Sequence, residues 1–381
     1  MKRKHYRALI ALLRVPELGN RRIQKLLEKT REWDEGPDEI FRLNISELTA
    51  IEGIGEGVAK NIADFSDWDA VDRIMDQTAK KGSKLISIED KHYPPLLREI
   101  YDPPILLWFK GDEEVLSSDG IAVIGTRRVG KYGSGQAKEW SRAIVHEGFT
   151  VNSGLAYGVD SLAHREALQS GGKTIAVLGS GVDVIYPSKN KPLVSEMIEK
   201  GSVIISEYPP GTQPDAMNFP GRNRIVSGMS HGVLVIESGV KGGSMITARS
   251  ALDQNREVFV IPHPLGSKFG EGCNYLIRTG QGKLVQSISD ILEEINPTQL
   301  NVLPNLELNI KPIRKMGARW KSLSLDEQES KLCRIMENGE IHIDQISDEL
   351  EKPVFELHSI LLNLELKGAI SQKAGKYYKL C

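Results

Sequence analysis

The feature that most constrains the fold is a repeated alternation of short apolar runs with helical patterns between residues 117 and 295. Within these runs, apolar residues do not alternate with polar ones, as they would in a sheet with one solvated face. Such strands are typical of a parallel sheet covered by helices on both faces. The runs are IAVIG, TVNSG, TIAVLGSG, SVIISE, GVLVIES and VFVIP. We therefore expect an α/β domain, a Rossmann-like doubly wound parallel sheet, over residues 81–295.

Residues 81–116 precede this pattern and carry two Pro pairs within HYPPLLREIYDPPILLWFKG. The Pro pairs exclude a regular helix, whereas the apolar run ILLWF suits a strand that leads into the sheet. Each later strand is followed by a helix, as a doubly wound sheet requires. The helical patterns cover residues 134–147, 158–170, 191–200, 221–230 and 244–254.

Residues 1–80 form a pattern of short helices and are predicted to be a small domain of their own. Two of its turns, VPELGNRRIQKLL and IEGIGEGVAKNI, combine an apolar residue, a glycine turn and an amphipathic helix. They resemble the helix-hairpin-helix motif, in which glycines such as Gly53, Gly55 and Gly57 let backbone N–H groups approach a DNA phosphate. A turn of a helical bundle explains the pattern as well. The acidic second half of the segment argues against a strong DNA footprint.

The C-terminal part of the chain predicts a second domain behind a linker. Residues 296–320 contain Pro and Asn and end in the basic run RKMGARWK. Residues 321–381 combine three helical patterns with a final hairpin, which predicts a winged-helix-like domain. A DNA-reading helix is basic, but the third pattern contains Glu356 and Glu365 and few bases. We therefore expect this domain to dock on a protein.

Composition excludes several classes of protein. The formal net charge is −2 over 381 residues, so a nucleic-acid site must be a local patch. Cys273, Cys333 and Cys381 are too far apart for a metal site and do not make a disulfide framework, which suits a reducing cytosol. The apolar run at residues 8–13 is shorter than a signal-peptide core, and no run reaches the roughly 20 residues of a membrane span. We expect a cytoplasmic protein without a membrane segment.

The candidate site follows from the sheet. In doubly wound sheets, ligands bind beyond the carboxyl ends of the strands. The first strand runs into a glycine-led basic turn, and the helix from Ser134 aims its N-terminus there, which predicts a bound anion. Later strand ends add further glycines and cations. The candidate residues are Gly125, Thr126, Arg127, Arg128, Lys189, Lys191, Phe219, Arg222, Asn223, Arg224, Lys241, Gly242, Gly243 and Ser244.

The nature of these residues indicates the ligand. A mononucleotide needs one or two cations, whereas a row of them along one sheet edge fits a polyanion. Phe219 adds a flat face on which a base can stack. Duplex DNA hides its base faces, so the pattern favours single-stranded DNA, with Arg222 and Arg224 on phosphates. Asn223 would hold the turn. Core packing of Phe219 behind Pro220 is the alternative.

Seven motifs occur in the order found in the DNA-processing protein A (DprA/Smf) family, which the chain resembles over residues 85–295. They are GTRR, NSGLAYGVDSLAH, VLGSGVDVIYP, SEYPPGTQPDAMNFPGRNRIVSG, GGSMITA, VFVIP and GCNYLIRTG. The resemblance implies binding of single-stranded DNA by the Rossmann-like domain and a homodimer formed through that domain. It also implies delivery of the strand to the RecA recombinase in natural transformation, with single-strand-binding protein displaced from the strand or sharing it. On matching positions, it puts Arg127, Phe219, Arg222 and residues 242–244 on the DNA.

An enzyme is the alternative. The fold and the KGGSMIT run also resemble the nucleotide-hydrolysing members of the lysine-decarboxylase-like superfamily, but the catalytic Glu that follows their glycine turn is missing here. Glu207 and Glu237 lie at strand ends and could form a carboxylate pair, although arginines nearby favour structural ion pairs. Asp160 and His164 share a helical face, which an N-cap Asp with a packed His explains more simply. We predict no catalytic residue, metal or cofactor.

Overall fold

The structure, a computed structural model, divides into two compact units, Met1–Val302 and Leu303–Cys381. It describes residues 2–33, 36–295 and 320, together with residues 325–380 except 337–338, 340, 351, 353–356, 358–359, 362, 366, 368 and 374–376. Apart from Trp320, the predicted linker and its basic run lie outside the described residues. The helical N-terminal segment and the sheet belong to one compact unit, and the predicted boundary at residue 80 stays a prediction.

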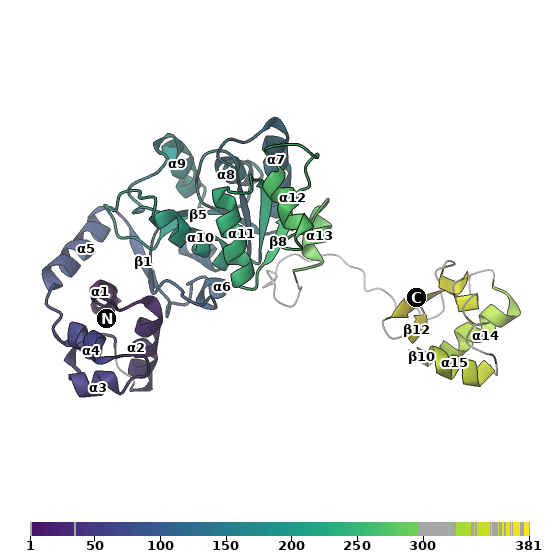
Figure 1. Cartoon of the computed structure of the whole chain (residues 1–381), viewed down its shortest axis with the longest axis horizontal. Coiled ribbons are helices and arrows are strands. Elements are labelled where there is room, and N and C mark those ends of the chain that lie inside the picture. The colour runs from purple at the N-terminus through teal and green to yellow at the C-terminus, as the bar shows by residue number, and fades with distance from the viewer. Residues whose placement is uncertain are drawn as a thin grey trace. The chain divides into compact units, whose positions relative to one another are not determined.

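The N-terminal segment is helical, as predicted (Figure 1). Its elements are α1 (Lys2–Arg14), α2 (Asn20–Glu32), η1 (Glu39–Arg42), α3 (Ile45–Thr49), α4 (Glu56–Ala63) and α5 (Trp68–Lys80). The basic α1 packs against the acidic α5, and Arg7 pairs with Asp72 at 2.7 Å. Arg14 pairs with Asp67 in the same way. The charge segregation of this segment is therefore used in part for internal ion pairs.

The two glycine turns of this segment have nearly the same backbone conformation. Gly19 before α2 has φ −79° and ψ 165°, and Gly55 before α4 has φ −83° and ψ 167°. Arg22 joins the two turns, since its guanidinium donates hydrogen bonds to the carbonyl oxygens of Glu17 and Gly53 at 2.8 and 3.0 Å. The helix-hairpin-helix assignment stays a prediction.

A nine-stranded sheet forms the centre of the first unit, in the order β1-β2-β6-β5-β4-β3-β7-β8-β9. Its strands are β1 (Lys84–Ser87), β2 (Leu106–Gly111), β3 (Gly120–Gly125), β4 (Thr150–Ser153), β5 (Thr174–Leu178), β6 (Val203–Ser206), β7 (Gly232–Glu237), β8 (Glu257–Val260) and β9 (Lys283–Leu284). The seven strands β6, β5, β4, β3, β7, β8 and β9 are parallel to one another, which confirms the predicted doubly wound sheet. The ILLWF run forms β2, but β2 pairs antiparallel with β6, as does β1 with β2.

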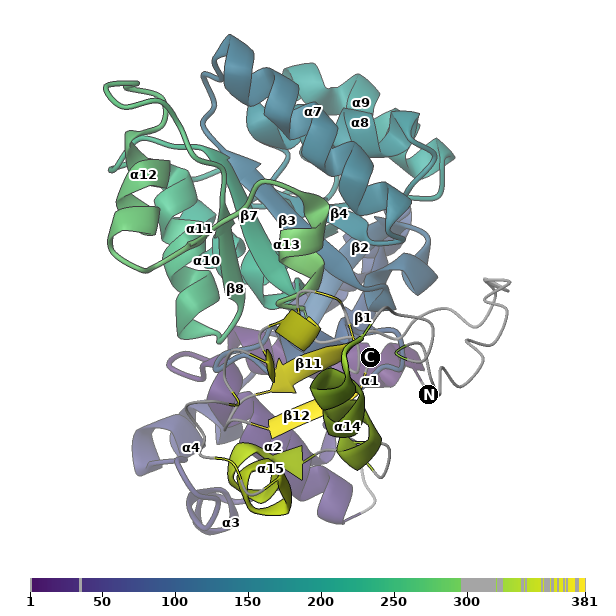
Figure 2. The ribbon, with the colours of Figure 1, turned by 90° about the vertical axis from the view of Figure 1, so that its right-hand side faces the viewer.

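Helices cover both faces of this sheet. Figure 2 shows α7, α8 and α9 along one face and α10, α11 and α12 along the other. Their bounds, with those of the shorter helices, are α6 (Pro95–Arg98), η2 (Glu113–Ser117), α7 (Lys131–His146), α8 (Val159–Gln169), η3 (Ser188–Asn190), α9 (Lys191–Glu199), α10 (Asn218–Gly228), α11 (Gly243–Asp253), α12 (Glu271–Arg278) and α13 (Ile288–Leu292). The apolar strand residues are buried on both sides, as the uninterrupted apolar runs require.

Helix α10 begins at Asn218, three residues before the predicted start. Phe219 and Pro220 therefore belong to its first turn rather than to the preceding loop. Pro is tolerated there because the first N–H groups of a helix have no intrahelical acceptor.

The second unit contains α14 (Glu327–Ile335), α15 (Ile343–Leu350) and a three-stranded antiparallel sheet. Its strands, β10 (Ile341–His342), β11 (Ile370–Lys373) and β12 (Tyr377–Leu380), pair in the order β10-β12-β11. Residues such as Leu332, Ile346 and Leu361 form its separate apolar core.

Candidate nucleic-acid interface

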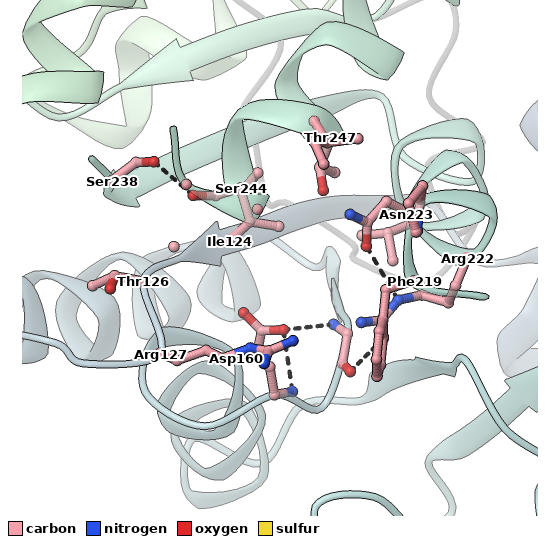
Figure 3. A pocket seen from close by; sticks show the side chains of 18 of the residues that line it. Ile124, Thr126, Arg127, Asp160, Phe219, Arg222, Asn223, Ser238, Ser244 and Thr247 are labelled. Carbon is pink, nitrogen blue, oxygen red and sulfur yellow. Dashed lines mark hydrogen bonds between the residues drawn. The ribbon is translucent and has the colours of Figure 1, made fainter. Parts of the chain in front are cut away.

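A cavity of about 570 Å³ opens where the strand order reverses, between β3 and β7. This switch point is the usual ligand position of a doubly wound sheet. Ends of β3, β4 and β7 and the first turns of α8, α10 and α11 build it (Figure 3). Ten of the predicted residues line it: Gly125, Thr126, Arg127, Arg128, Phe219, Arg222, Asn223, Gly242, Gly243 and Ser244.

The turn after β3 is shaped by its pairing with β7. The register between the two strands shifts at Gly125, and the Thr126 N–H donates to the carbonyl oxygen of Glu237 at 2.7 Å. A Cβ on Gly125 would lie 2.5 Å from the Val159 side chain, so only glycine fits this approach. After this irregularity, the exposed Arg127 and Arg128 line the cavity at its rim.

Phe219 lies half-buried in the first turn of α10. One edge of its ring packs on Gly179, where an added Cβ would lie 3.2 Å from the ring. The rest of the ring lines the cavity, and the Cζ atom of Arg127 lies 5.5 Å from the ring centre. Phe219 therefore packs against the protein with one edge of its ring and still lines the cavity.

Arg222 lies next to Phe219, with its Cζ atom 5.9 Å from the ring centre, and only 5% of the residue is exposed (Figure 3). Its Nη1 atom donates hydrogen bonds to the carbonyl oxygens of Gly154 and Val177, and its Nε atom donates to Asn223 Oδ1 at 3.2 Å. Burial lowers the pKa of this guanidinium to about 10, against the opposing charge of Asp160. Much of its hydrogen-bonding capacity is thus used inside the protein.

Asp160 and His164 are both buried in α8, but Asp160 is not the N-cap. Gly158, with φ 78°, is the N-cap, and Asp160 accepts the N–H groups of Gly154 and Ala156 at 3.1 and 3.2 Å. Burial raises the pKa of Asp160, although Arg222 opposes the shift. His164 packs in the core, as predicted, with Nδ1 2.6 Å from the Thr174 hydroxyl.

A carboxylate of the protein lies at the N-terminus of α7. Glu237 Oε1 accepts the N–H of Gly130, the N-cap of α7, at 2.8 Å. The same carboxylate lies against Gly133, where an added Cβ would come within 2.3 Å of Oε2. Glu237 therefore takes one N–H group at this helix end, and the use of the helix end for an external anion stays a prediction. Glu237 is a cap rather than the ion-paired group predicted.

The first turn of α11 also lines the cavity. Gly242 is the N-cap of this helix and has no side chain to block the approach of a ligand. The hydroxyl groups of Ser238 and Ser244 lie 2.7 Å apart at the end of β7. Backbone N–H groups at such a helix start attract anions.

Four of the predicted cations lie outside the cavity lining. Arg224 pairs with two carboxylates instead of lining the cavity, and its side chain is 17% exposed. Its Nε atom lies 3.1 Å from Asp102 Oδ2, and its Nη2 atom lies 2.7 Å from Glu207 Oε1. Glu207 is thus ion-paired, as predicted, and also accepts from Asn20 Nδ2 at 3.1 Å. The exposed Lys189, Lys191 and Lys241 lie on neighbouring segments.

Two residues beside the cavity were missed. Tyr157 and Tyr186 follow β4 and β5, and with Arg127 and Phe219 they line a narrow hollow of about 20 Å³ next to it. In both cases an aromatic residue follows a glycine at the end of a strand. Tyr157 follows Gly154 in GLAYG, and Tyr186 follows Gly181 in GSGVDVIYP. Neither motif shows by itself that its ring is exposed.

Comparison with known proteins identifies the family. Residues 84–296 match the model of the DNA recombination-mediator protein A family. The chain belongs to this family. Residues 321–376 match the DprA winged helix domain, which confirms the predicted winged helix.

Relatives and solved structures agree with this DprA assignment. Protein Smf of Escherichia coli is 36% identical over 301 residues, which cover 78% of this chain and 77% of that protein. The X-ray structure of DprA from Streptococcus pneumoniae is similar with a TM-score of 0.64 at 36% identity, over 76% of this chain and 97% of that chain. DprA from Helicobacter pylori has a TM-score of 0.50 at 30% identity, over 55% of this chain and 94% of that chain, and binds single-stranded DNA.

Two further features concern the described residues alone. Among them, no cluster of three or more His, Cys, Asp or Glu side chains could hold a metal ion. None of the helices in these segments is both long and apolar enough to cross a membrane.

Proposed function

We propose that this DprA-family chain binds single-stranded DNA in the cavity at the sheet switch point. The observation that carries the proposal is the partly exposed Phe219 ring with the Arg127 guanidinium 5.5 Å from its centre. A flat apolar face beside a cation suits a base and its phosphate, and stacking of this kind is worth about 1–3 kcal/mol per base. Duplex DNA could not offer the base face.

The described contacts support a division of roles among the candidate residues. Arg127 and Arg128 on the rim are available for phosphates, and the start of α11 at Gly242 offers backbone N–H groups. Arg222, whose guanidinium donates to two carbonyl oxygens, would hold the Phe219 ring, whose centre lies 5.9 Å from its Cζ atom. The exposed Lys189, Lys191 and Lys241 would bind the strand outside the cavity.

The wider role follows from the family. We propose that the chain acts without catalysis as a recombination mediator, which delivers single-stranded DNA to the RecA recombinase in natural transformation. It would act in the cytoplasm as a homodimer formed through the Rossmann-like domain, and it would displace single-strand-binding protein or share the strand with it. The winged-helix domain would dock on a protein partner.

Fluorescence anisotropy with a labelled oligo-dT and a blunt duplex, across a salt series, tests the binding step. We expect tight, salt-sensitive binding to the single strand and weak binding to the duplex, since phosphate contacts release counterions. Phe219→Ala should weaken binding without changing the salt slope, and Arg127→Ala should reduce the slope. Equal affinity for both DNAs would shift the site to the N-terminal hairpins, and absence of binding would contradict the proposal.

A RecA-loading assay tests the second step. RecA filament formation on oligo-dT coated with single-strand-binding protein should accelerate when the chain is added. The Phe219→Ala variant should lose this effect in proportion to its lost affinity. DNA binding without acceleration would limit the function to strand binding.

A further inference from the structure

Three aromatic rings and Arg127 line one narrow hollow beside the cavity. Tyr157 and Tyr186 are 42% and 46% exposed, and they share the narrow hollow with Phe219. The ring centres of Tyr186 and Phe219 lie 6.0 Å apart, with planes inclined at 42°. A single exposed aromatic needs no explanation, but a contiguous set next to a cation forms a surface that suits a ligand.

The loop that carries Tyr157 is held in an uncommon conformation. Leu155 is fully buried and has φ 58°, the left-handed region that side chains rarely adopt. Buried Asp160 accepts the N–H groups on both sides of Leu155, those of Gly154 and Ala156. Such backbone persists only where the surroundings determine it, and it concentrates at binding sites.

A buried amide ties this loop to the segment after Tyr186. Asn190 is only 2% exposed, and its side-chain amide donates a hydrogen bond to the carbonyl oxygen of Leu155 at 2.8 Å. The two tyrosines, which come from different strand ends, are therefore carried by loops that are joined to each other. Loops that are held in this way lose little conformational freedom when they bind a ligand.

We propose that Tyr157 and Tyr186 form a second base-binding station, which takes the nucleotide adjacent to the one at Phe219. This inference rests on the proposed single-stranded DNA binding and adds a second contact to it. Lys189, in η3, follows Tyr186 by three residues and is exposed, so a strand on this station has a cation for a phosphate on the same segment. Stacking accepts any base, so the station takes single strands of any sequence.

The test compares wild type, the Tyr157→Ala/Tyr186→Ala pair and the Tyr157→Phe/Tyr186→Phe pair in anisotropy titrations with oligo-dT. The Ala pair should weaken binding about 5- to 150-fold at an unchanged salt slope, since it removes stacking but no cation. The Phe pair should bind as wild type does. Tyr101→Ala is the matched control, because Tyr101 is 74% exposed and does not line the hollow.

The outcomes separate this inference from the proposed function. If wild type does not bind oligo-dT, the proposed function fails and the station fails with it. If Phe219→Ala weakens binding but the Ala pair does not, only the station is overturned. A reduced salt slope for the Ala pair would also overturn it, because the tyrosines would then act by positioning the lysines.

Photocrosslinking of wild type avoids dependence on variant folding. Oligonucleotides that contain 4-thiothymidine should crosslink to the peptides containing Tyr157 and Tyr186 as well as to the peptide containing Phe219. Crosslinks to the peptides containing Phe219 or Lys241, with none to the peptides containing Tyr157 and Tyr186, would contradict the station.

Discussion

The guanidinium of Arg222 lies against the α-carbon of Gly154 and donates a hydrogen bond to its carbonyl oxygen. A Cβ at Gly154 would lie 2.5, 2.6 and 2.7 Å from Nη1, Cζ and Nη2. An arginine that the sequence predicted for a phosphate is therefore packed into the cavity wall next to Phe219. The end of β4 and the first turns of α10 form one packed unit at this contact.

Gly154→Ala should disturb that unit. The added methyl must displace the guanidinium, and overpacking of this kind costs about 1–3 kcal/mol. We expect a lower free energy of unfolding in urea and weaker binding to oligo-dT. Gly135→Ala is the control, because nothing lies within 4 Å of its added Cβ in the exposed face of α7. Equal stability of Gly154→Ala and wild type would show that the guanidinium relocates without cost.

Arg224→Ala should affect stability more than DNA binding. The Arg224 guanidinium contacts Asp102 and Glu207, and its side chain is 17% exposed. Its removal leaves the partly buried Glu207 carboxylate without its cation, with a hydrogen bond from Asn20 remaining. We expect a loss of about 1–3 kcal/mol in the free energy of unfolding and an unchanged salt slope. Arg127→Ala should instead lower the slope by about 0.7 for each phosphate that the variant no longer neutralises. Equal slope changes in the two variants would return Arg224 to the interface.

His164 predicts acid sensitivity of the fold. Burial, assisted by the charge of Arg222, lowers the pKa of His164 from 6.5 to about 3. Below pH 6.5 the unfolded chain binds a proton that the folded chain does not, so stability present above pH 6.5 is lost as the pH falls toward 3. At 1.36 kcal/mol per unit, the loss is about 2 kcal/mol at pH 5.

Denaturant unfolding at pH 7 and pH 5 measures this loss. His164→Asn should remove the His164 contribution to the difference between the two pH values. The exposed His146, in the last turn of α7, provides the control substitution His146→Asn. Asp160 acts in the opposite direction, since its raised pKa favours the folded state at low pH. An unchanged difference in His164→Asn would show that this histidine does not carry the effect.

Glu237→Gln should weaken the start of α7. The amide keeps the shape of the side chain but loses the charge that the helix N-terminus and the Gly130 N–H stabilise. A charged group at this position contributes about 0.3–2 kcal/mol, so thermal unfolding should occur at a lower temperature. Glu257→Gln, at the exposed start of β8, should leave the unfolding temperature unchanged. Equal temperatures for the two variants would contradict a capping role.

Several elements could be predicted because local physics determines them. The runs around Val123, Val177 and Val235 are apolar on both sides, which only a strand covered on two faces accommodates. The glycine-led turn at Gly125 was predicted at the correct strand end, and the cavity does form there. Boundaries were less accurate: α10 begins at Asn218 because Pro220 is tolerated in a first turn.

Other elements depended on partners distant in the sequence. β2 follows the predicted strand run, but its antiparallel direction comes from pairing with β6, nearly a hundred residues later. Glu237 caps α7 across 107 residues, and the sequence around it gives no sign of that contact. The sequence around Tyr157 and Tyr186 gives no sign that both rings are exposed or that their loops are joined through Asn190.

The sequence by itself determined the parallel sheet, its helices and the strand ends at which Arg127, Phe219 and Arg222 occur, because periodicity and turn chemistry act over a few residues. Only the tertiary structure decided which cations stay exposed and which are bound by acceptors of the protein itself. An arginine is equally suited to a phosphate, a carboxylate or a pair of carbonyl oxygens. Its choice among them is set by acceptors that the fold brings to it, as with Gly154 for Arg222 and Glu207 for Arg224.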